Sequence, residues 1–342
     1  AGHEVAWEEL ELPWSLPCSS EEKAQGVPSY SLSEKELVVS GDGFKYVFNR
    51  TDGQLTSMVV QDMELLESPL RLNLWRAPLA NELDNWNASS ARSSNWKEGY
   101  RYTVATEMYS AGIDRLTHQP LSFSVSETTE GVHIHIIDAE LMGKGEKEKK
   151  DLYIEGIQNN GIINHYEYII NSEGTIEIRH VLKPEGKMPL WFPRIGLTLT
   201  VSDALDQVKW YGRGPQENYP DRKTGYPTGI YASTVQAMYE PYLMPQDYGL
   251  RTDVRWLQLT TDKGIGLQFK MNEWFNFNIY PYSTDNLTKA MYTYQLQKQK
   301  GMTLNLDYAT TGVGCTARGV FGAYKAMPQE YRRTISIRPM MK

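Results

Sequence analysis

Alternating hydrophobic and polar residues along most of the chain predict β-strands rather than helices. The alternation, or a dense run of β-branched and aromatic residues, marks the segments 132–138, 165–170, 175–182, 264–270 and 333–339. Gly-containing turn signals punctuate these strands, at 42–43, 51–54, 159–161, 172–174 and 261–264. Helical signals are few, with one weak candidate at 89–100. Short strands joined by frequent turns predict an all-β antiparallel sandwich or barrel.

The first thirty residues differ from the rest of the chain. Residues 13–31 are polar, contain Pro and Ser and show no periodicity, which is typical of a linker. The chain begins within a strand-like pattern and without an apolar signal core, as expected of a piece cut from a longer polypeptide. We therefore expect a residual strand of a preceding domain at 1–16, a linker at 17–29 and one large β-domain at 30–342.

Composition narrows the class of partners. The net charge is −7 and the pI is near 5.5, so no broad basic field exists to attract nucleic acid. No apolar run reaches the roughly 18–20 residues that span a bilayer. Cys18 and Cys315 lack metal-ligand spacing and favour two free thiols. The six histidines form no HExxH-like motif, and those at 133, 135, 165 and 180 fall within strand patterns, mostly as sheet-surface residues. The alternating charge run 144–150 indicates a solvated loop.

The most informative loop is WYGRGPQENYPDR, at 210–222. Its Gly and Pro residues impose a tight backbone course, and an Arg guanidinium matches a carboxylate in two hydrogen bonds. We therefore expect Arg213 or Arg222 to bond Glu217, Asp221 or nearby carbonyls. The alternative is that the same groups face a polyol, but a retaining glycosidase needs two carboxylates about 5–5.5 Å apart, which this turn does not specify.

Three further loops are candidates. In LWRAPLANELDNW (74–86), Arg76 is the better functional candidate, whereas the acids indicate a surface loop without an EF-hand register. The loop at 239–256 interleaves Tyr, Pro and Arg, which suits either sugar stacking or a crossover pinned by aromatic packing. The glycines of 310–324 fit neither GxGxxG nor a P-loop, and indicate a connection that approaches a neighbouring surface closely.

Taken together, these loops resemble the large bacterial β-galactosidases of glycoside hydrolase family two. WYGRGPQENYPDR resembles their GPxENYPDR signature, and LWRAPLANELDNW resembles their WRAPxDND segment. The loop PYLMPQDYGLRTDVRW is similar to their PY-x-x-P-x-x-x-G-x-R stretch, and AGHEVAWEELELPW resembles the end of the preceding immunoglobulin-like domain. The resemblance runs in order from residue 1 to the C-terminus.

The resemblance implies a galactose-mutarotase-like supersandwich of two large, mostly antiparallel sheets. It implies a parent enzyme that hydrolyses terminal β-D-galactosides with retention, through two glutamates and a Mg²⁺ site in an upstream barrel. This chain would then hold no catalytic residue, no metal and no cofactor. It would complete the active-site wall and pack on the upstream catalytic and immunoglobulin-like domains. The candidates for facing a carbohydrate or the pocket are Arg76, Asn81, Glu217, Asn218, Arg222, Arg251 and Arg318.

This sequence departs from the family pattern in two places. The first Asp of WRAPxDND is Ala80 and the second is Glu82, and the Gly-rich loop 312–319 lacks the Trp that some members carry. Two other readings stay open: a stand-alone carbohydrate-binding module, and an aldose 1-epimerase with a His acid and a Glu base facing one sugar. The natural substrate, a homo-oligomeric parent, and the compartment, bacterial cytoplasm or periplasm, are left open.

Overall fold

The computed structural model describes residues 7–10, 26–83, 104–143, 160–314 and 319–341. Helices in these ranges are short: α1 (Ala80–Leu83), α2 (Val104–Ser110), α3 (Thr284–Lys289) and 3₁₀ turns at Thr293–Gln295 and Gly322–Tyr324. None of the described helices has the length and hydrophobicity that a bilayer crossing requires. The helical candidate 89–100, the charge run 144–150 and both cysteines lie outside the described residues.

The strands form two antiparallel sheets, the smaller of which is a simple meander. Its five strands pair in chain order. They are β1 (Ser29–Leu32), β2 (Glu36–Gly41), β3 (Phe44–Asn49), β4 (Gln54–Val60) and β5 (Met63–Glu64).

The larger sheet has twelve strands, and its main path runs β13-β12-β14-β15-β17-β10-β9-β8-β7. The strands of this path are β7 (Thr117–Thr128), β8 (Gly131–Leu141), β9 (Gly161–Ile170), β10 (Ile176–Glu185), β12 (Gln207–Arg213), β13 (Thr228–Thr234), β14 (Arg251–Thr260), β15 (Gly266–Tyr280) and β17 (Tyr331–Met340). A side arm adds β6 (Leu66–Asn73), β11 (Arg194–Val201) and β16 (Met302–Thr310).

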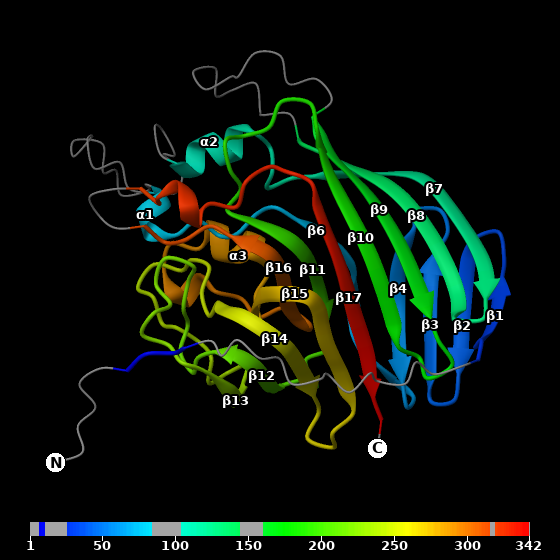
Figure 1. Cartoon of the computed structure of the whole chain (residues 1–342). Helices are drawn as coiled ribbons and strands as arrows, with labels where there is room; N and C mark the ends of the chain where they lie inside the picture. Colours follow the sequence, from blue (N-terminus) through cyan, green and yellow to red (C-terminus); the bar gives the residue numbers. More distant parts are fainter. Residues whose placement is uncertain (1–6, 11–25, 84–103, 144–159, 315–318, 342) are drawn as a thin grey trace.

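The long strand β15 joins two layers. Its first part, from Gly266 to Met271, pairs with β17, and its last part, from Asn276 to Tyr280, pairs with β16. One arm continues through β17 to β7, and the other through β16 and β11 to β6, beside which β4 lies. Figure 1 shows β7–β10 and β17 crossing over β1–β4. The small sheet and the β6 arm therefore form one layer, and the β17–β7 arm forms the other.

Side chains of the two layers pack directly against each other. The Phe48 ring meets the edge of the Tyr168 ring with centroids 5.2 Å apart, and the Tyr46 hydroxyl donates to the Gly174 carbonyl over 2.7 Å. Gly174 has a φ of +76°, and a Cβ there would lie 2.6 Å from the Phe44 ring, so only glycine fits this turn. These contacts confirm the expected sandwich of two large antiparallel sheets.

The five segments expected to be strands lie in β8, β9, β10, β15 and β17, which confirms those predictions. Alternation places Ile176, Ile178 and Leu182 of β10 in the core with no exposure. His180 has the same parity and is 1% exposed, and His133 of β8 is 8% exposed, so the expectation that the strand histidines lie mostly on the sheet surface is wrong for these two. The His180 ring stacks on Tyr166 with centroids 4.2 Å apart and contacts the Tyr308 hydroxyl through Nδ1 at 2.6 Å.

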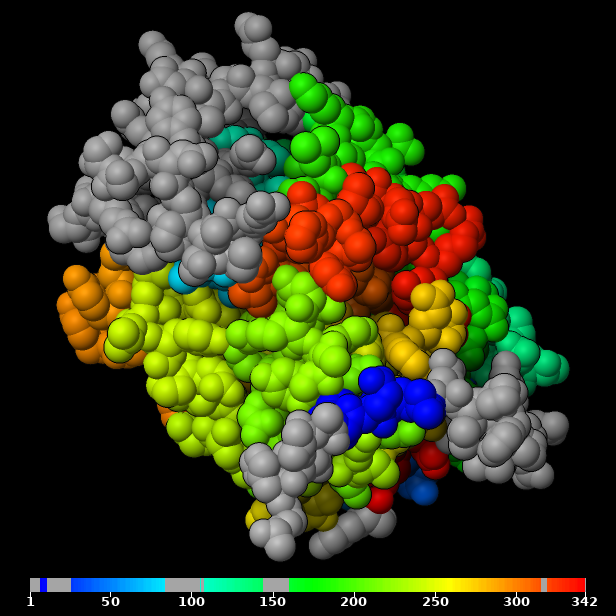
Figure 2. Space-filling model, turned by 60° about the vertical axis from the view of Figure 1, so that its left-hand side comes forward, coloured from blue at the N-terminus to red at the C-terminus, as the bar shows by residue number. Residues whose placement is uncertain are grey.

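Residues 7–10 are the described part of the expected residual strand. They form no strand, and Glu9 contacts Arg213 at 3.5 Å and accepts from the Thr228 amide at 3.4 Å. Figure 2 shows this segment, in blue, lying across the green surface of β12 and β13. The rest of the expected strand and most of the linker lie outside the described residues, so the proposed domain boundaries stay predictions.

Candidate functional site

Loops from distant parts of the chain meet at one end of the sandwich. The Asp247 amide donates to the Ala77 carbonyl over 3.1 Å, and the Val313 amide donates to Asp221 Oδ1 over 2.9 Å. A small apolar cluster lies beneath them, separate from the main core, and consists of Ala77, Tyr248, Tyr280 and Leu287. The loops that converge here are 74–83, 214–226, 239–250 and 311–314, and they contain most of the residues singled out from the sequence.

Arg76 is the centre of the first contact between loops. Its guanidinium is fully buried and donates from Nη1 to the Thr311 carbonyl at 2.7 Å. Nη2 donates to the Gly312 carbonyl at 3.0 Å and to Glu82 Oε1 at 2.7 Å. The other oxygen of Glu82 accepts from the Leu79 amide at 2.9 Å. Glu82 is therefore a buried ion-pair partner, and the expectation that the acids of this loop lie on the surface is wrong for it.

The same segment, 311–314, is also held from the opposite loop. Asp221 accepts from the amides of Val313 and Gly314 at 2.9 and 2.7 Å, and the Asn81 amide group donates to the Val313 carbonyl at 3.1 Å. A Cβ at Gly312 would lie 2.3 Å from the Asp221 carboxyl carbon, which confirms the close approach expected of this Gly-rich stretch. The backbone up to Gly314 is thus fixed by charge-assisted hydrogen bonds.

Glu217 confirms the prediction that the 210–222 loop satisfies itself. Its carboxylate accepts from Arg222 Nη2 and from the Gly249 amide, both at 2.9 Å, and from the Tyr242 hydroxyl. Burial, followed by the bond to Glu217, raises the pKa of Tyr242 to about 12, so this phenol remains a donor at neutral pH. Glu217 therefore ties three stretches of chain together.

Asn218, in the 214–226 loop, and Arg251, the first residue of β14, lie deeper. Asn218 is fully buried, and its Oδ1 accepts from the amide and the hydroxyl of Thr252. Arg251 is 2% exposed, donates from Nη1 to the Gly249 carbonyl at 2.8 Å and lies 5.4 Å from the centre of the Trp210 ring. Burial lowers the pKa of Arg251 to about 10, because its charge is only partly compensated by nearby carboxylates.

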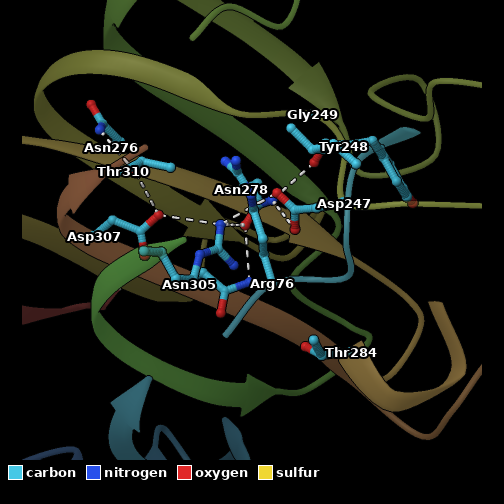
Figure 3. Close-up of polar contacts among 12 residues, drawn as sticks. Arg76, Asp247, Tyr248, Gly249, Asn276, Asn278, Thr284, Asn305, Asp307 and Thr310 are labelled. Carbon is cyan, nitrogen blue, oxygen red and sulfur yellow. Dashed lines mark hydrogen bonds and ion pairs between the residues drawn. The ribbon is translucent and has the colours of Figure 1, made fainter. Parts of the chain in front are cut away.

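A fully buried polar network lies beneath the loops, around Arg194. Its Nη2 lies 3.2 Å from Asp307, 3.5 Å from Asp247 and 3.2 Å from the side-chain carbonyl of Asn278. Figure 3 shows the side chains of Asp247, Asn278, Asn305 and Asp307 gathered in one region beneath the loops. Burial raises the pKa of Asp307 to about 6, although the guanidinium opposes the shift. Asn278 also donates to the Tyr248 carbonyl at 2.9 Å, which links the network to the loop above.

Sequence reasoning missed this network, although the chain carried a signal for it. Asn276 and Asn278 alternate on β15, and Asn305 and Asp307 alternate on β16. Asn and Asp are depleted in strands, so two of them at one parity indicate a buried polar pairing. The partner of these strands, Arg194 on β11, has no comparable signal because it opens its strand at a position that also suits an exposed cation.

The structure gives the candidate residues different positions. Arg76, Glu217, Asn218 and Arg251 are buried and bonded to protein groups. Asn81 is partly exposed, and the side chain of Arg222 is 47% exposed. Arg318 lies outside the described residues. A direct contact of these side chains with sugar stays a prediction.

The geometry of the described loops suits positioning rather than proton transfer. The carboxylates of Glu82, Glu217 and Asp221 each accept hydrogen bonds from protein donors on both oxygens. A glycosidase pair instead presents one acid and one nucleophile to a glycosidic bond. The cluster therefore fixes the shape of a rim, on which partly exposed groups and loop backbone face outward.

Sequence comparison with known proteins matches this chain to β-galactosidases. A family model described as the β-galactosidase small chain matches residues 40–337. A β-galactosidase of Priestia megaterium (strain DSM 319 / IMG 1521) is 32% identical over 314 residues, which are 92% of this chain and 27% of that protein. The chain thus spans about a quarter of the length of this relative.

Solved structures with a similar fold include aldose epimerases. A putative aldose 1-epimerase from Escherichia coli K12 is 9% identical, with a TM-score of 0.43 over 89% of this chain and 98% of that one. A galactose 1-epimerase from Lactobacillus acidophilus NCFM is 10% identical, with a TM-score of 0.43 over 92% and 98% of the two chains.

Proposed function

The chain belongs to the β-galactosidase small-chain family, and from this premise we propose that it is a non-catalytic domain of a β-galactosidase. The parent enzyme hydrolyses terminal β-D-galactosides with retention. Because the chain covers 27% of the length of its β-galactosidase relative, we infer that the acid, the nucleophile and the Mg²⁺ belong to another part of the parent. The domain described here completes one wall of the active-site pocket with its loop rim.

The observation that supports this role is the engagement of every loop carboxylate named above by protein donors. A general acid needs a proton that it can give to a leaving group, and a nucleophile needs an uncovered oxygen. Glu217, the glutamate of the family signature, has a cation, an amide and a hydroxyl around it. It holds loops together, and the chemistry belongs elsewhere in the parent.

Exposed aromatic side chains support packing on another part of the parent. Tyr292 and Tyr294 stack with ring centroids 5.4 Å apart, although they are 51% and 78% exposed. Paired exposed aromatics of this kind are typical of surfaces that another protein unit covers. The upstream catalytic and immunoglobulin-like domains are the partners that we propose for this surface.

The epimerase alternative needs a His acid and a Glu base facing one sugar. A His and a Glu do meet on the sheet, but His133 Nδ1 lies 3.3 Å from Glu167 Oε1. No sugar ring fits between groups this close. The other oxygen of Glu167 accepts from Arg179 at 3.1 Å, which holds it as a carboxylate acceptor. The match to the β-galactosidase small chain favours the domain of a glycosidase, and the epimerase alternative still needs a direct test because His135 and Glu167 line one cavity.

The test is hydrolysis of a chromogenic β-galactoside by the purified chain, beside the full-length parent. We expect turnover by the parent and none by the chain, with galactose binding in the millimolar range or weaker, on the order expected for an incomplete pocket. Polarimetry of fresh α-galactose tests the epimerase reading in the same preparation. Turnover that survives repurification and is lost in Glu217→Gln, but not in the exposed control Asp203→Asn, would overturn the proposal.

A further inference from the structure

Two histidines and a glutamate share the outward face of the β8–β9 pair. Residues two apart on a strand point to the same face, so the side chains of His133 and His135 emerge together from β8. Glu167 of β9 pairs directly opposite His135 and therefore faces the same way. The core-facing parity of β8 is taken by Val132 and Ile134.

The three side chains are close enough to bind one ion. One ligand atom from each of them lies within 4.8 Å of the others. His133 Nδ1 and Glu167 Oε1 are 3.3 Å apart, which is long for a hydrogen bond. It is close to the edge of a tetrahedron built with metal–ligand bonds of about 2.0–2.1 Å. His135 is exposed, so its ring is able to rotate onto the third vertex.

Neighbouring groups already orient two of these ligands. His133 Nε2 lies 2.8 Å from the Thr128 hydroxyl, which leaves Nδ1 for the ion once Nε2 carries the proton. Arg179 donates to Glu167 Oε2 and so turns Oε1 toward the histidines. Metal-binding histidines commonly donate their second ring N–H in this manner.

Carboxylates surround the cation nearest to the three ligands. Arg179 has Glu167, Glu177 and Glu130 around it, with closest approaches of 3.1, 2.8 and 4.0 Å. Arg179 is thus engaged by carboxylates, and Arg332 and Arg333, which line the neighbouring cavity, pair with Glu330 and Glu273.

An open coordination position would face a hollow in the surface. His135, Glu167 and Arg179 contribute to the lining of a cavity of about 480 Å³ on the outer face of β8, β9, β10 and β17. A tetrahedral ion with three protein ligands has its fourth position free for water or a small ligand. His165 lines the same cavity one row further along the sheet.

A second cluster, His118 with Asp138 and Glu140, is a poorer candidate although its ligand atoms are equally close. His118 Nδ1 already bonds Glu140 at 2.8 Å, and Nε2 bonds the Asp52 carbonyl at 2.7 Å. Neither ring nitrogen is left for an ion. Asp138 is likewise held by the Asn164 amide group at 2.7 Å.

We propose that His133, His135 and Glu167 form an open three-ligand binding site for Zn²⁺ or a similar borderline transition-metal ion. Two imidazoles and one carboxylate suit Zn²⁺, whereas Mg²⁺ and Ca²⁺ prefer oxygen ligands throughout. The site departs from the sequence expectation of no metal in this chain. It lies on the sheet and is independent of the loop rim and of the glycosidase proposal.

The test is isothermal titration calorimetry of the metal-free chain with Zn²⁺ at neutral pH. We expect one equivalent to bind with a dissociation constant on the order of 1 µM or below, and no binding of Mg²⁺ or Ca²⁺ in the same range. His135→Gln and Glu167→Gln should each weaken binding by at least about 100-fold, and Thr128→Val by roughly 10–100-fold. Unfolding midpoints of the metal-free variants verify that they fold.

His165→Gln is the matched control, because it removes an exposed histidine from the same face without removing a proposed ligand. Its Zn²⁺ affinity should equal that of the unsubstituted chain. Titration with Co²⁺ gives a second readout, since a four-coordinate site produces a visible absorption band that His135→Gln should lose. Absence of Zn²⁺ binding below about 100 µM, or equal losses in His165→Gln and His135→Gln, would overturn the proposal.

Discussion

Replacing Arg76 by methionine should destabilise the chain by about 3–5 kcal/mol. The side chain is fully buried, and the substitution removes its bonds to the Thr311 and Gly312 carbonyls and to Glu82. Methionine fills the same space, so little of the loss arises from a cavity. The greater part arises from Glu82, whose side chain is 8% exposed and would retain a charge without a cation.

The charge argument makes a stronger prediction for the double variant. Glu82→Gln alone should cost about 1–3 kcal/mol, since Arg76 keeps its two carbonyl acceptors. In the Glu82→Gln background, Arg76→Met no longer leaves a buried carboxylate unpaired. The sum of the destabilisations of the two single variants should therefore exceed that of the double variant by roughly 1–3 kcal/mol.

Urea unfolding of the purified chain, followed by tryptophan fluorescence, measures all four proteins of this cycle. Lys289→Met is the control, because it breaks an ion pair with Asp285 whose side chains are 74% and 68% exposed. Its unfolding midpoint should stay near that of the unsubstituted chain. A cost for Arg76→Met below about 1 kcal/mol, or full additivity in the cycle, would refute the argument from the buried charge.

Three other outcomes can be checked on the same material. Burial lowers the pKa of His180 to about 3, so the neutral ring is the folded form while the unfolded chain binds a proton near pH 6.5. The free energy of unfolding should therefore fall as pH drops from 6.5 toward 3, and urea titrations across that range should show a flatter profile for His180→Gln. Gly312→Ala places a Cβ 2.3 Å from the Asp221 carboxyl carbon and should cost about 1–3 kcal/mol, whereas Gly319→Ala, with open space around it, should melt normally. Glu217→Gln should lower the melting temperature without changing galactose binding by nuclear magnetic resonance titration; normal melting with lost binding would contradict its positioning role.

Local patterns predicted the strands well because each strand has one face in the core. Alternation identified β8, β9, β10 and β17 without any tertiary information. The order of these strands in the sheet was out of reach, since β10 pairs with β17, whose residues lie more than a hundred positions away. Nothing local indicates that β15 divides its length between two partners.

The alternation pattern indicated a buried position for His180, but its polar residue type led to the prediction of a surface position. In TIEIRHVL, His180 follows Ile176 and Ile178 at the same parity, and Leu182 continues the series. A polar residue in the apolar phase of a strand predicts a buried group with a partner. His133 has the opposite parity, because Val132 and Ile134 take the core-facing positions of β8. The two histidines therefore have different environments, although both lie between apolar residues of a strand.

The candidate loops were predicted in kind, but their partners were not. Mixed Arg and carboxylate composition was enough to expect a self-satisfied turn around Glu217. Arg76 could not be assigned its acceptors, because Thr311 and Gly312 lie 235 and 236 residues away. Glu82 stands where the family pattern has Asp. Only the structure shows what the longer side chain does: it accepts hydrogen bonds from both Arg76 and the Leu79 amide.

The burial of these groups changes how substitutions in the parent enzyme are to be interpreted. A loss of activity in a variant of Arg76 or Glu217 would be expected even if neither side chain touches substrate, because both fix the course of the rim. A lysine at Arg76 would keep the charge, but one ammonium lacks the planar fork that reaches two carbonyls and a carboxylate. Contact with substrate is therefore best tested at Asn81 and Arg222, which are partly exposed, with unfolding measured alongside because each also makes a hydrogen bond within the rim. A change in substrate affinity there, with unfolding unchanged, separates recognition from positioning.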